Sequence, residues 1–276
     1  MPSETCDRIA VLICALATED EELVSRALRS SAIGLQSTDC IYLLVDGAES
    51  VDEARWRGWT NGVPVRFHYS ANRVGLAAGL NKLIDSALDH TQWTFFARMD
   101  ADDECLPSRF DCQRHFLIEN PHIDILGARC REVDENGAHL RTKRLPQTHD
   151  CIVSSLPKRN PLNHPTVMIR RSVFESGLRY RTDVGLVEDW CLWVDAAAAG
   201  FRFANLDEVV LNFRRGTDFF NKRGGRKTAT AEWHVRRHAR KVLHKSSPAN
   251  FCYAVAASSL RLMPAGIQAA VYKTVN

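Results

Sequence analysis

The stretch ARMDADDECLPSRF, residues 97–110, decides the fold of this chain. It overlaps the end of an apolar run, WTFFA (93–97), whose composition predicts a buried strand. Three carboxylates, Asp100, Asp102 and Asp103, come directly after that strand. Crowded carboxylates repel one another, so a hard divalent cation with oxygen ligands is their natural partner, and such a cation usually carries phosphates with it.

A helix is predicted to begin at Pro107, because proline suits the first helical position. The residues that follow it at helical spacing are Phe110, Arg114, Leu117 and Ile118. A strand, an acidic turn and a helix in this order place the acids at the carboxyl end of a strand, where α/β folds bind their ligands. A metal-held nucleotide is therefore the first hypothesis. An acidic turn that only caps the next helix is the alternative.

The composition is that of an ordinary soluble globular protein. The chain has 276 residues, 45% hydrophobic and 25% charged, which suffices for one sizeable α/β domain or a domain with an appendage. Nine cysteines are scattered without a C-x-x-C pair, which favours a reduced cytosolic chain over a disulfide scaffold or a zinc site. The N-terminus has no export signal, and no window reaches about 18 uninterrupted apolar residues, so we expect neither export nor a membrane span.

Charge is distributed unevenly along the chain. The net charge is +3, but residues 222–245 hold nine Lys/Arg against the single Glu232, so the body is mildly acidic and the tail basic. Such a tail could meet nucleic acid, an anionic membrane or a diphosphate, or form a solvated helix face. The apolar stretch 251–272, interrupted by Arg261 and Pro264, suits a helix lying in a membrane interface; packing onto the catalytic domain is the alternative.

Strands and helices alternate, which predicts a mostly parallel sheet. The predicted strands are 8–16, 40–47, 64–70, 93–97 and 123–129. Thr18 and Glu21 suggest a capping box for the first helix, and another helix is expected from Gly75. Asp46 and the acids at 100–103 then fall at strand ends on one edge of the sheet. An ordinary Asp-Gly turn is the alternative for Asp46.

Two downstream segments carry polar residues suited to a substrate. The segment RNPLNHPTVMIRRSVF (159–174) places two asparagines and His164 on a proline-stiffened loop before an apolar strand, which suits the orientation of a hydroxyl-rich substrate. A purely structural histidine is the alternative. The segment VEDWCLWVDAAAAG (187–200) predicts a helix that ends at a glycine, with Glu188 and Asp189 in its first turn. The helix dipole favours acids there whatever the function, and it also keeps a carboxylate ionised, as a general base must be.

The order of these motifs resembles the family-2 glycosyltransferases, particularly the bacterial enzymes of exopolysaccharide and capsule assembly of the amylovoran type. The motifs are DG (46–47), NRVGLAAGLN (72–81), RMDADD (98–103) with PSRF (107–110), RNPLNHPTVM (159–168), EDWCLWV (188–194) and RGG (223–225). The resemblance runs from about residue 9 to the C-terminus. It implies an α/β fold of the nucleotide-diphospho-sugar transferase (GT-A) type, a mixed sheet flanked by helices with a helical C-terminal appendage.

We expect a catalytic domain over residues 1–220 and a basic and apolar helical tail over 221–276. Within the catalytic domain, residues 8–130 would form the nucleotide-binding half and residues 131–220 the acceptor half.

The resemblance also implies roles for single residues. Those implied to bind the donor nucleotide are Ala15, Ala17, Asp46, Asn72, Gly75, Arg98, Asp100, Ala101 and Arg223. Asp100 and Asp102 would hold Mg²⁺ or Mn²⁺, with Asp103 completing the shell. Many family members carry Pro-x-Tyr-Asn where this chain has ALAT (15–18), so base contacts there depart from the family pattern.

On the acceptor side, the resemblance makes Asp189 the catalytic base, with Glu188 in support. The residues implied to bind the acceptor are Asn163, His164 and Trp190. The implied reaction is metal-dependent transfer with inversion of a hexose from a nucleotide sugar, by family habit a UDP-sugar, to a lipid-diphosphate-linked glycan. The expected location is cytoplasmic, with peripheral contact to the inner face of the cytoplasmic membrane.

Two rival classes can be weighed against this reading. A metal-dependent phosphatase or nucleotidyltransferase could use the same acids, but the chain has no phosphate-cradling G-x-x-x-x-G-K-S/T loop. A nucleic-acid-binding module could use the basic tail, but the tail lacks interleaved aromatic residues and the body is acidic, so no nucleic-acid partner is expected.

Overall fold

The computed structural model describes residues 7–216, 219, 224–264, 266–268 and 271. The strands are β1 (Arg8–Leu16), β2 (Cys40–Asp46), β3 (Val65–Ser70), β4 (Trp93–Asp100), β5 (Glu104–Cys105), β6 (Ile125–Val133), β7 (His139–Thr142), β8 (Met168–Arg170) and β9 (Phe203–Arg214). The helices are α1 (Glu21–Ile33), α2 (Glu53–Gly58), α3 (Leu76–Leu88), α4 (Arg109–Glu119), α5 (His149–Ser155), α6 (Arg171–Glu175), α7 (Glu188–Ala198), α9 (Arg226–Val242) and α10 (Pro248–Arg261), with a 3-10 turn η1 (His164–Thr166).

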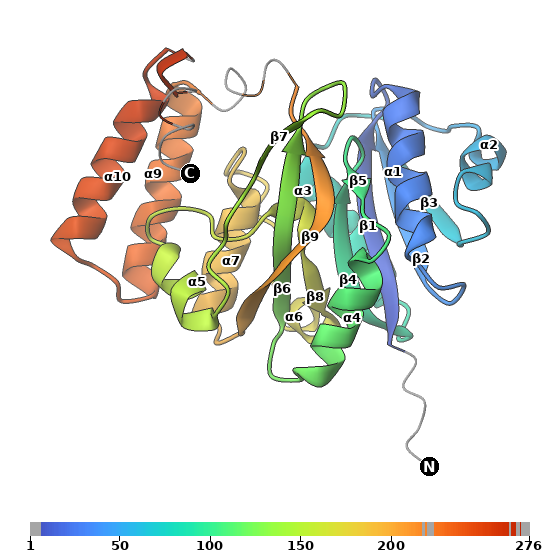
Figure 1. Cartoon of the computed structure of the whole chain (residues 1–276), viewed down its shortest axis with the longest axis horizontal. Helices are drawn as coiled ribbons and strands as arrows, with labels where there is room; N and C mark the ends of the chain where they lie inside the picture. The colour runs from blue at the N-terminus through green and yellow to red at the C-terminus, as the bar shows by residue number, and fades with distance from the viewer. Residues whose placement is uncertain (1–6, 217–218, 220–223, 265, 269–270, 272–276) are drawn as a thin grey trace.

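All the strands named above belong to one mixed sheet, with the order β3-β2-β1-β4-β8-β6-β9-β5 and with β7 paired to β6 (Figure 1). The strands β3, β2, β1 and β4 run parallel, so their carboxyl ends meet at one edge. The short strand β8 is antiparallel to both β4 and β6, and β6 runs parallel to β9. The strand order reverses between β1 and β4, because β2 and β3 are added on one side of β1 and β4 lies on its other side. Open α/β sheets bind their ligands at the carboxyl ends of the strands at such a point.

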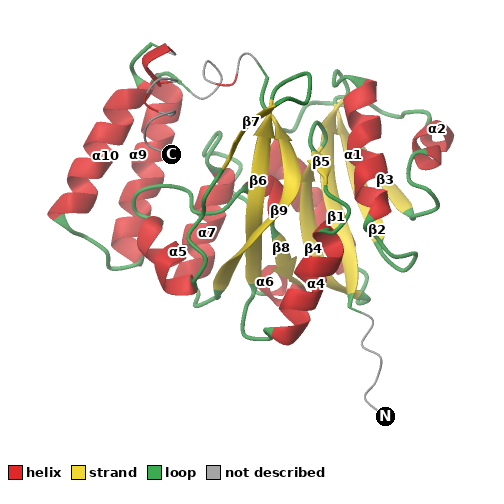
Figure 2. Cartoon of the chain, viewed as in Figure 1, coloured by secondary structure: helices red, strands yellow, loops and turns green. Residues whose placement is uncertain are grey.

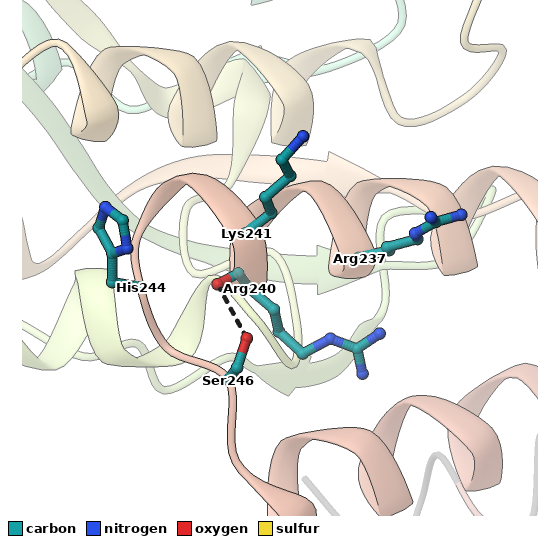
Figure 3. Close-up of a pocket in the computed structure, with 5 residues that line it drawn as sticks. All are labelled: Arg237, Arg240, Lys241, His244 and Ser246. Carbon is teal, nitrogen blue, oxygen red and sulfur yellow. Dashed lines mark hydrogen bonds between the residues drawn. The ribbon is translucent and has the colours of Figure 1, made fainter.

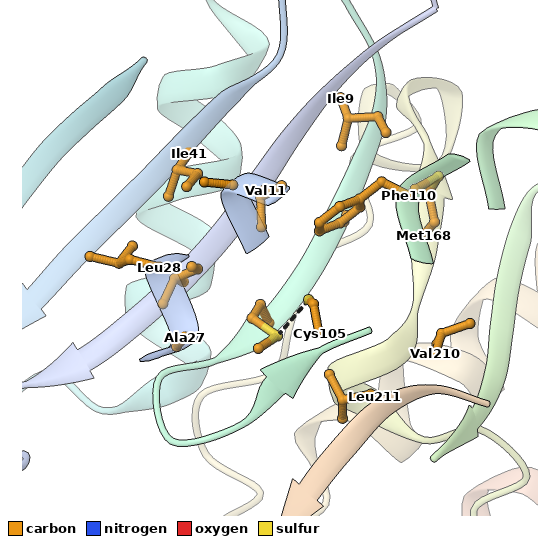
Figure 4. Close-up of a cluster of buried hydrophobic side chains, with 14 of the residues drawn as sticks. Ile9, Val11, Ala27, Leu28, Ile41, Cys105, Phe110, Met168, Val210 and Leu211 are labelled. Atoms are coloured by element: carbon orange, nitrogen blue, oxygen red, sulfur yellow. Dashed lines mark hydrogen bonds between the residues drawn. The ribbon is translucent and has the colours of Figure 1, made fainter. Parts of the chain in front are cut away.

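Helices cover both faces of the sheet because its central strands are apolar on both faces (Figure 2). Ile9, Val11 and Ile13 of β1 pack against α1 and α4 through side chains such as Leu28 and Phe110 (Figure 4). The alternate residues of β1, Ala10 and Leu12, pack on the opposite face, in a cluster with residues of α3, α6 and α7. The two clusters make a three-layer α/β sandwich.

The C-terminal helices α9 and α10 lie side by side at the end of the molecule beyond α7 and α5 (Figure 1). Val235 and Ala239 of α9 belong to the same buried cluster as α7. In contrast, Ala254 is buried on α10, while Phe251, Val255 and other large apolar side chains of this helix are exposed. Among the residues described here, no helix combines the length and apolarity that a membrane span requires.

Most of the expected strands agree with the structure, and two helix starts differ. The first helix is capped by Asp20, whose side chain accepts a hydrogen bond from the Glu22 N–H, so a capping box of Thr18 and Glu21 is wrong. The carboxylate of Glu21 instead accepts a hydrogen bond from the Trp56 indole at 2.9 Å. The helix expected from Pro107 begins two residues later, at Arg109.

A buried carboxylate, Asp39, fixes the start of β1 and ties it to α4. Its two oxygens accept hydrogen bonds from the Ile9 and Gln36 N–H groups, both at 2.8 Å, and it forms an ion pair with Arg114. Both Asp39 and Arg114 are buried. Because both partners are buried, water cannot solvate one of them if the other is removed.

We predict that Asp39→Ala lowers the free energy of unfolding by about 3–5 kcal/mol, because it leaves the Arg114 charge and two backbone N–H groups without their partner. Urea unfolding followed by circular dichroism measures the loss. Glu22→Ala, which removes the exposed ion pair with Arg26, is the control and should cost less than about 1 kcal/mol. Equal losses in the two variants would contradict the structural role of Asp39.

Candidate active site

The carboxyl edge of the parallel strands brings together the first predicted site residues. Strand register sets Leu16 beside Asp46, and Cys14 beside Asp100. Ala15 and Ala17, at the end of β1, thus lie between the two acidic positions, and the Ala17 N–H donates to the Asp46 carbonyl oxygen at 2.9 Å. This agrees with the expectation that Asp46 and the 100–103 acids share one edge.

Asp46 holds the loop that leads into α3. Its two carboxylate oxygens accept hydrogen bonds from the Val74 and Gly75 N–H groups, both at 2.9 Å. Gly75 precedes α3 with a φ of 82°, a conformation that glycine adopts without steric cost. Asn72 lies in the same loop, where its carbonyl oxygen accepts a hydrogen bond from the Ser70 hydroxyl. Asp46 therefore holds the loop that carries Asn72 by bonding the Val74 and Gly75 backbone.

The three acids after β4 form a cluster whose carboxylate oxygens all lie within 4.8 Å of one another. Burial and the neighbouring Asp100 raise the pKa of Asp102 to about 6. Burial, Asp100 and Asp102 raise the pKa of Asp103 well above its ordinary value. Ala101, between Asp100 and Asp102 in the chain, is buried in the turn that brings the carboxylates together. A divalent cation would relieve this repulsion, since it favours the ionised form of each ligand.

Asp103 has one oxygen committed and one available. Its Oδ1 atom accepts a hydrogen bond from the Arg214 N–H at 2.8 Å, whereas its buried Oδ2 atom has no hydrogen-bond partner within the part of the chain that the structure describes. A buried carboxylate oxygen without a partner is costly unless an ion or water satisfies it. The cluster therefore fits a hard cation with oxygen ligands, such as Mg²⁺ or Mn²⁺.

Arg98 is buried beneath the acids, 3% exposed, and forms an ion pair with Asp100. Burial disfavours its charged form, but the surrounding negative charges, Asp100 first among them, raise the pKa of Arg98 overall. Its Nε and Nη1 atoms have no hydrogen-bond partner among the described residues. Arg98 is thus placed to orient the Asp100 carboxylate. Its own side chain is buried and is not part of the exposed surface that a nucleotide donor would contact.

The loop 159–168 lies directly beside Arg98, because the Arg98 N–H donates to the Val167 carbonyl oxygen at 3.0 Å. His164 is buried, and its Nε2 atom lies 3.0 Å from the Tyr180 hydroxyl. Burial, and then the Arg98 charge, lower the pKa of His164 well below its ordinary value, so the imidazole is neutral. Asn163 is also buried and donates to the Ala128 carbonyl oxygen. Both predicted acceptor residues therefore stabilise the loop from inside.

The first turn of α7 carries Glu188 and Asp189. Asp189 is half-buried; its Oδ2 atom accepts a hydrogen bond from the Asn160 side-chain amide at 2.6 Å, and its Oδ1 atom accepts one from the Trp190 N–H at 2.6 Å. Glu188 is buried, and burial together with the Asp189 charge raises the pKa of Glu188 to about 7. Asp189 is thus the oriented, accessible member of the pair.

Trp190, which the resemblance places among the acceptor-binding residues, is buried in the structure. Its side chain is 4% exposed, and its indole N–H donates to the Leu156 carbonyl oxygen at 3.0 Å. The reason is helical periodicity, since the residue after Asp189 turns toward the core face of α7 with Trp193 and Val194. Trp190 therefore contacts Asp189 through its backbone N–H, while its side chain packs in the core. Arg223 lies outside the described residues.

Electrostatic interactions connect the acids after β4 with those of α7. The charges of Arg98 and Asp100 both act on Glu188, and Arg98, Asp189 and Glu188 all act on the buried Tyr180. The two groups of carboxylates therefore lie within electrostatic reach of the same buried Arg98. One group can hold a cation and the other can accept a proton, which is the division of labour that a metal-assisted group transfer requires.

Tyr180 was not singled out by the sequence patterns, because it lies in a stretch without a motif. Asn160 was one of the two asparagines of the polar loop, but the sequence assigned it no contact with Asp189. Arg214 ends a strand that was not predicted.

Comparisons with known proteins agree with this geometry. No family model matches the chain. The chain is 30% identical over 266 residues to the amylovoran biosynthesis glycosyltransferase AmsE of Erwinia amylovora, covering 96% of this chain and 97% of that protein. It is 25% identical over 279 residues to the UDP-Gal:alpha-D-GlcNAc-diphosphoundecaprenol beta-1,3-galactosyltransferase of Escherichia coli, covering 99% and 98% of the two chains.

Solved structures share the fold. TarS of S. aureus in complex with UDP matches with a TM-score of 0.59 at 16% identity, over 86% of this chain and 70% of that one. The mannosyltransferase PcManGT of Pyrobaculum calidifontis in complex with GDP-Man and Mn²⁺ matches with a TM-score of 0.61 at 15% identity, over 97% and 80%. The fold is of the GT-A type, as expected. With a relative of 30% identity along nearly its whole length, the chain belongs to the amylovoran-type glycosyltransferases of bacterial exopolysaccharide assembly.

Proposed function

We propose that this chain is an inverting, metal-dependent hexosyltransferase that moves a sugar from a UDP-sugar to a lipid-diphosphate-linked glycan. The observation that carries the proposal is the pairing of a metal-competent acid cluster after β4 with an oriented carboxylate, Asp189, in one electrostatic environment. Two of the similar proteins support the substrates: one is named for a UDP-Gal donor and a diphosphoundecaprenol acceptor, and one was solved with UDP.

On the donor side, Asp100 and Asp102 would hold Mg²⁺ or Mn²⁺ against the diphosphate, with the available oxygen of Asp103 completing the shell. The bound cation would offset the negative charge that builds on the departing diphosphate. Asp46 and the end of β1 line the same edge and would border the nucleoside. Arg98 would keep Asp100 turned toward the ligand, and Arg223, which lies outside the described residues, would bind the diphosphate as the resemblance implies.

On the acceptor side, Asp189 would remove the proton of the attacking hydroxyl while that oxygen bonds to the anomeric carbon on the face opposite the leaving diphosphate. One displacement of this kind inverts the anomeric configuration and needs no protein nucleophile. The hydrogen bond from Asn160 and the one from the Trp190 N–H fix the direction of the Asp189 carboxylate. Glu188, buried next to Asp189 in the first turn of α7, would support Asp189 in this role.

We further propose that the α9–α10 pair rests on the inner face of the cytoplasmic membrane. Arg237, Arg240, Lys241, His244 and Ser246 line a hollow of about 520 Å³ at the end of α9 (Figure 3). The exposed apolar side chains of the second helix and the turn after it are Phe251, Tyr253, Val255, Leu262, Met263 and Ile267. Cations beside an exposed apolar face suit an anionic lipid surface, which attracts the former and accommodates the latter.

We predict that Mn²⁺ allows UDP to stabilise the wild-type protein and that Asp102→Asn abolishes this effect, because the variant removes a charged metal ligand. A ligand at about 100 times its dissociation constant adds roughly 2.7 kcal/mol of stability, which thermal-shift measurements detect. UDP, GDP, TDP and CDP are compared with and without Mn²⁺. An undiminished UDP shift in Asp102→Asn with Mn²⁺ would contradict the metal assignment, and a shift with GDP alone would contradict the UDP donor.

We predict that Asp189→Asn lowers turnover roughly 10²–10⁴-fold while leaving the Mn²⁺-dependent UDP shift intact, since losing a general base spares donor binding. UDP release is measured from UDP-glucose, UDP-galactose and their N-acetyl forms, with lipid-linked glycans extracted from bacterial membranes as acceptors. Product anomers are assigned by nuclear magnetic resonance. Near-normal turnover in the variant, or a retained anomeric configuration, would contradict the mechanism.

We predict that Arg237→Gln and Lys241→Gln each weaken binding to phosphatidylglycerol vesicles roughly fivefold, because each cation near an anionic surface contributes about 1 kcal/mol. Leu262→Ser should weaken it as well. Ile118→Ser, an equally exposed apolar position on α4, is the matched control and should bind as the wild type does. Sedimentation with the vesicles measures binding, and equal binding by all variants would contradict contact through this surface.

A further inference from the structure

A buried arginine, Arg236, is one of the residues that join the C-terminal helix α9 to the body of the protein. Its side chain is 4% exposed, its Nη2 atom donates to the Glu232 carboxylate at 2.8 Å, and its Nε atom donates to the Lys158 carbonyl oxygen at 2.9 Å. Its guanidinium carbon lies 5.0 Å from the centre of the Trp190 ring. A guanidinium over an indole face is an attractive contact that gains strength when water is excluded.

These contacts reach both of the segments that hold Asp189. Trp190 is the next residue along α7, and its N–H donates to the Asp189 carboxylate. Lys158 lies two residues before Asn160, whose side-chain amide donates to the other oxygen of the same carboxylate. Arg236 therefore braces the helix and the loop that converge on Asp189.

The brace extends into the second C-terminal helix. Glu232 also accepts a hydrogen bond from the Nε atom of Arg261, at the end of α10, at 2.9 Å, and forms an ion pair with its Nη2 atom at 2.7 Å. The Gly225 N–H donates to the Arg261 carbonyl oxygen. Buried ion pairs contribute little to net stability, because removing charges from water offsets their attraction. The planar guanidinium of Arg236 instead contributes geometric restraint, because it holds three partners at once: the Glu232 carboxylate, the Lys158 carbonyl oxygen and the Trp190 ring.

We propose that Arg236 is a positioning residue of the transferase reaction: it holds Trp190 and the Lys158–Asn160 loop so that the Asp189 carboxylate keeps its catalytic direction. The proposal rests on the proposed role of Asp189 as the base. It assigns α9 a part in catalysis beyond any contact with a membrane. Misplacing a reacting group by about 1 Å can lower a rate by 10²-fold, so a distant brace can control turnover.

Arg236→Met tests the proposal, because it keeps an apolar stem near Trp190 and removes the guanidinium. The expected result is a kcat at least about 10-fold lower with an unchanged KM for the UDP-sugar and an unchanged Mn²⁺-dependent UDP shift. The matched control is Arg181→Met. Arg181 bonds Asp195 of α7 and lies 3.2 Å from His238 of α9, so it ties the same two helices away from Asp189, and kcat should stay within about twofold of wild type.

A double-mutant cycle separates positioning from a general loss of stability. In the Asp189→Asn background, adding Arg236→Met should lower kcat less than about twofold, because the group that it positions is already disabled. A full 10-fold loss in that background, or a wild-type kcat in Arg236→Met alone, would overturn the proposal. Glu232→Gln, which preserves shape and weakens the hold on Arg236, replaces Arg236→Met in the cycle if the latter does not fold.

The cycle also separates this inference from the proposed function. If Asp189→Asn alone turns over normally, the base assignment has failed, whatever Arg236 does. If Asp189→Asn is inactive and Arg236→Met is fully active, the base assignment stands and the positioning role has failed.

Discussion

The repulsion among the carboxylates at the end of β4 is the constraint on which the rest of the site depends. Asp100, Asp102 and Asp103 are held within 4.8 Å of one another by the turn that leads to α4. Such an arrangement folds only because opposite charges and hydrogen-bond donors surround it. The buried guanidinium of Arg98 pairs with Asp100, and the Arg214 N–H bonds Asp103. These supports come from inside the fold and leave the open side of the cluster for a cation.

The same buried charge explains why the acceptor half of the site is so densely bonded. Arg98 lies next to η1, where burial and then the Arg98 charge lower the pKa of His164, and the Arg98 charge also acts on Tyr180 and Glu188. A cation in a core of this polarity is tolerated when its neighbours are negative or neutral acceptors. The acids after β4 and those of α7 thus share one electrostatic environment around Arg98.

Sequence patterns predicted the donor half of the fold well and the acceptor half incompletely. The strands around 8–16 and 40–47 are apolar on both faces and bounded by turn residues, so their pattern is unambiguous. The long strand β9 was missed because it mixes charged and apolar residues, and its position beside β6 depends on contacts distant in sequence. Among the site residues, Asp100 and Asp102 follow from the motif. The support of Asp189 by Asn160 does not, since it joins segments 29 residues apart.

The C-terminal helices show how far local pattern can mislead about the role of a basic segment. From composition, Arg236 is one of nine similar cations in a charged tail. In the fold it is among the least exposed of them, and it is fixed by a carboxylate, a carbonyl oxygen and an aromatic ring. Arg237, the next residue, faces solvent at the basic hollow. One turn of α9 therefore has two different surfaces. The inner one contacts the Trp190 ring and the Lys158 carbonyl oxygen, and the outer one is exposed and basic.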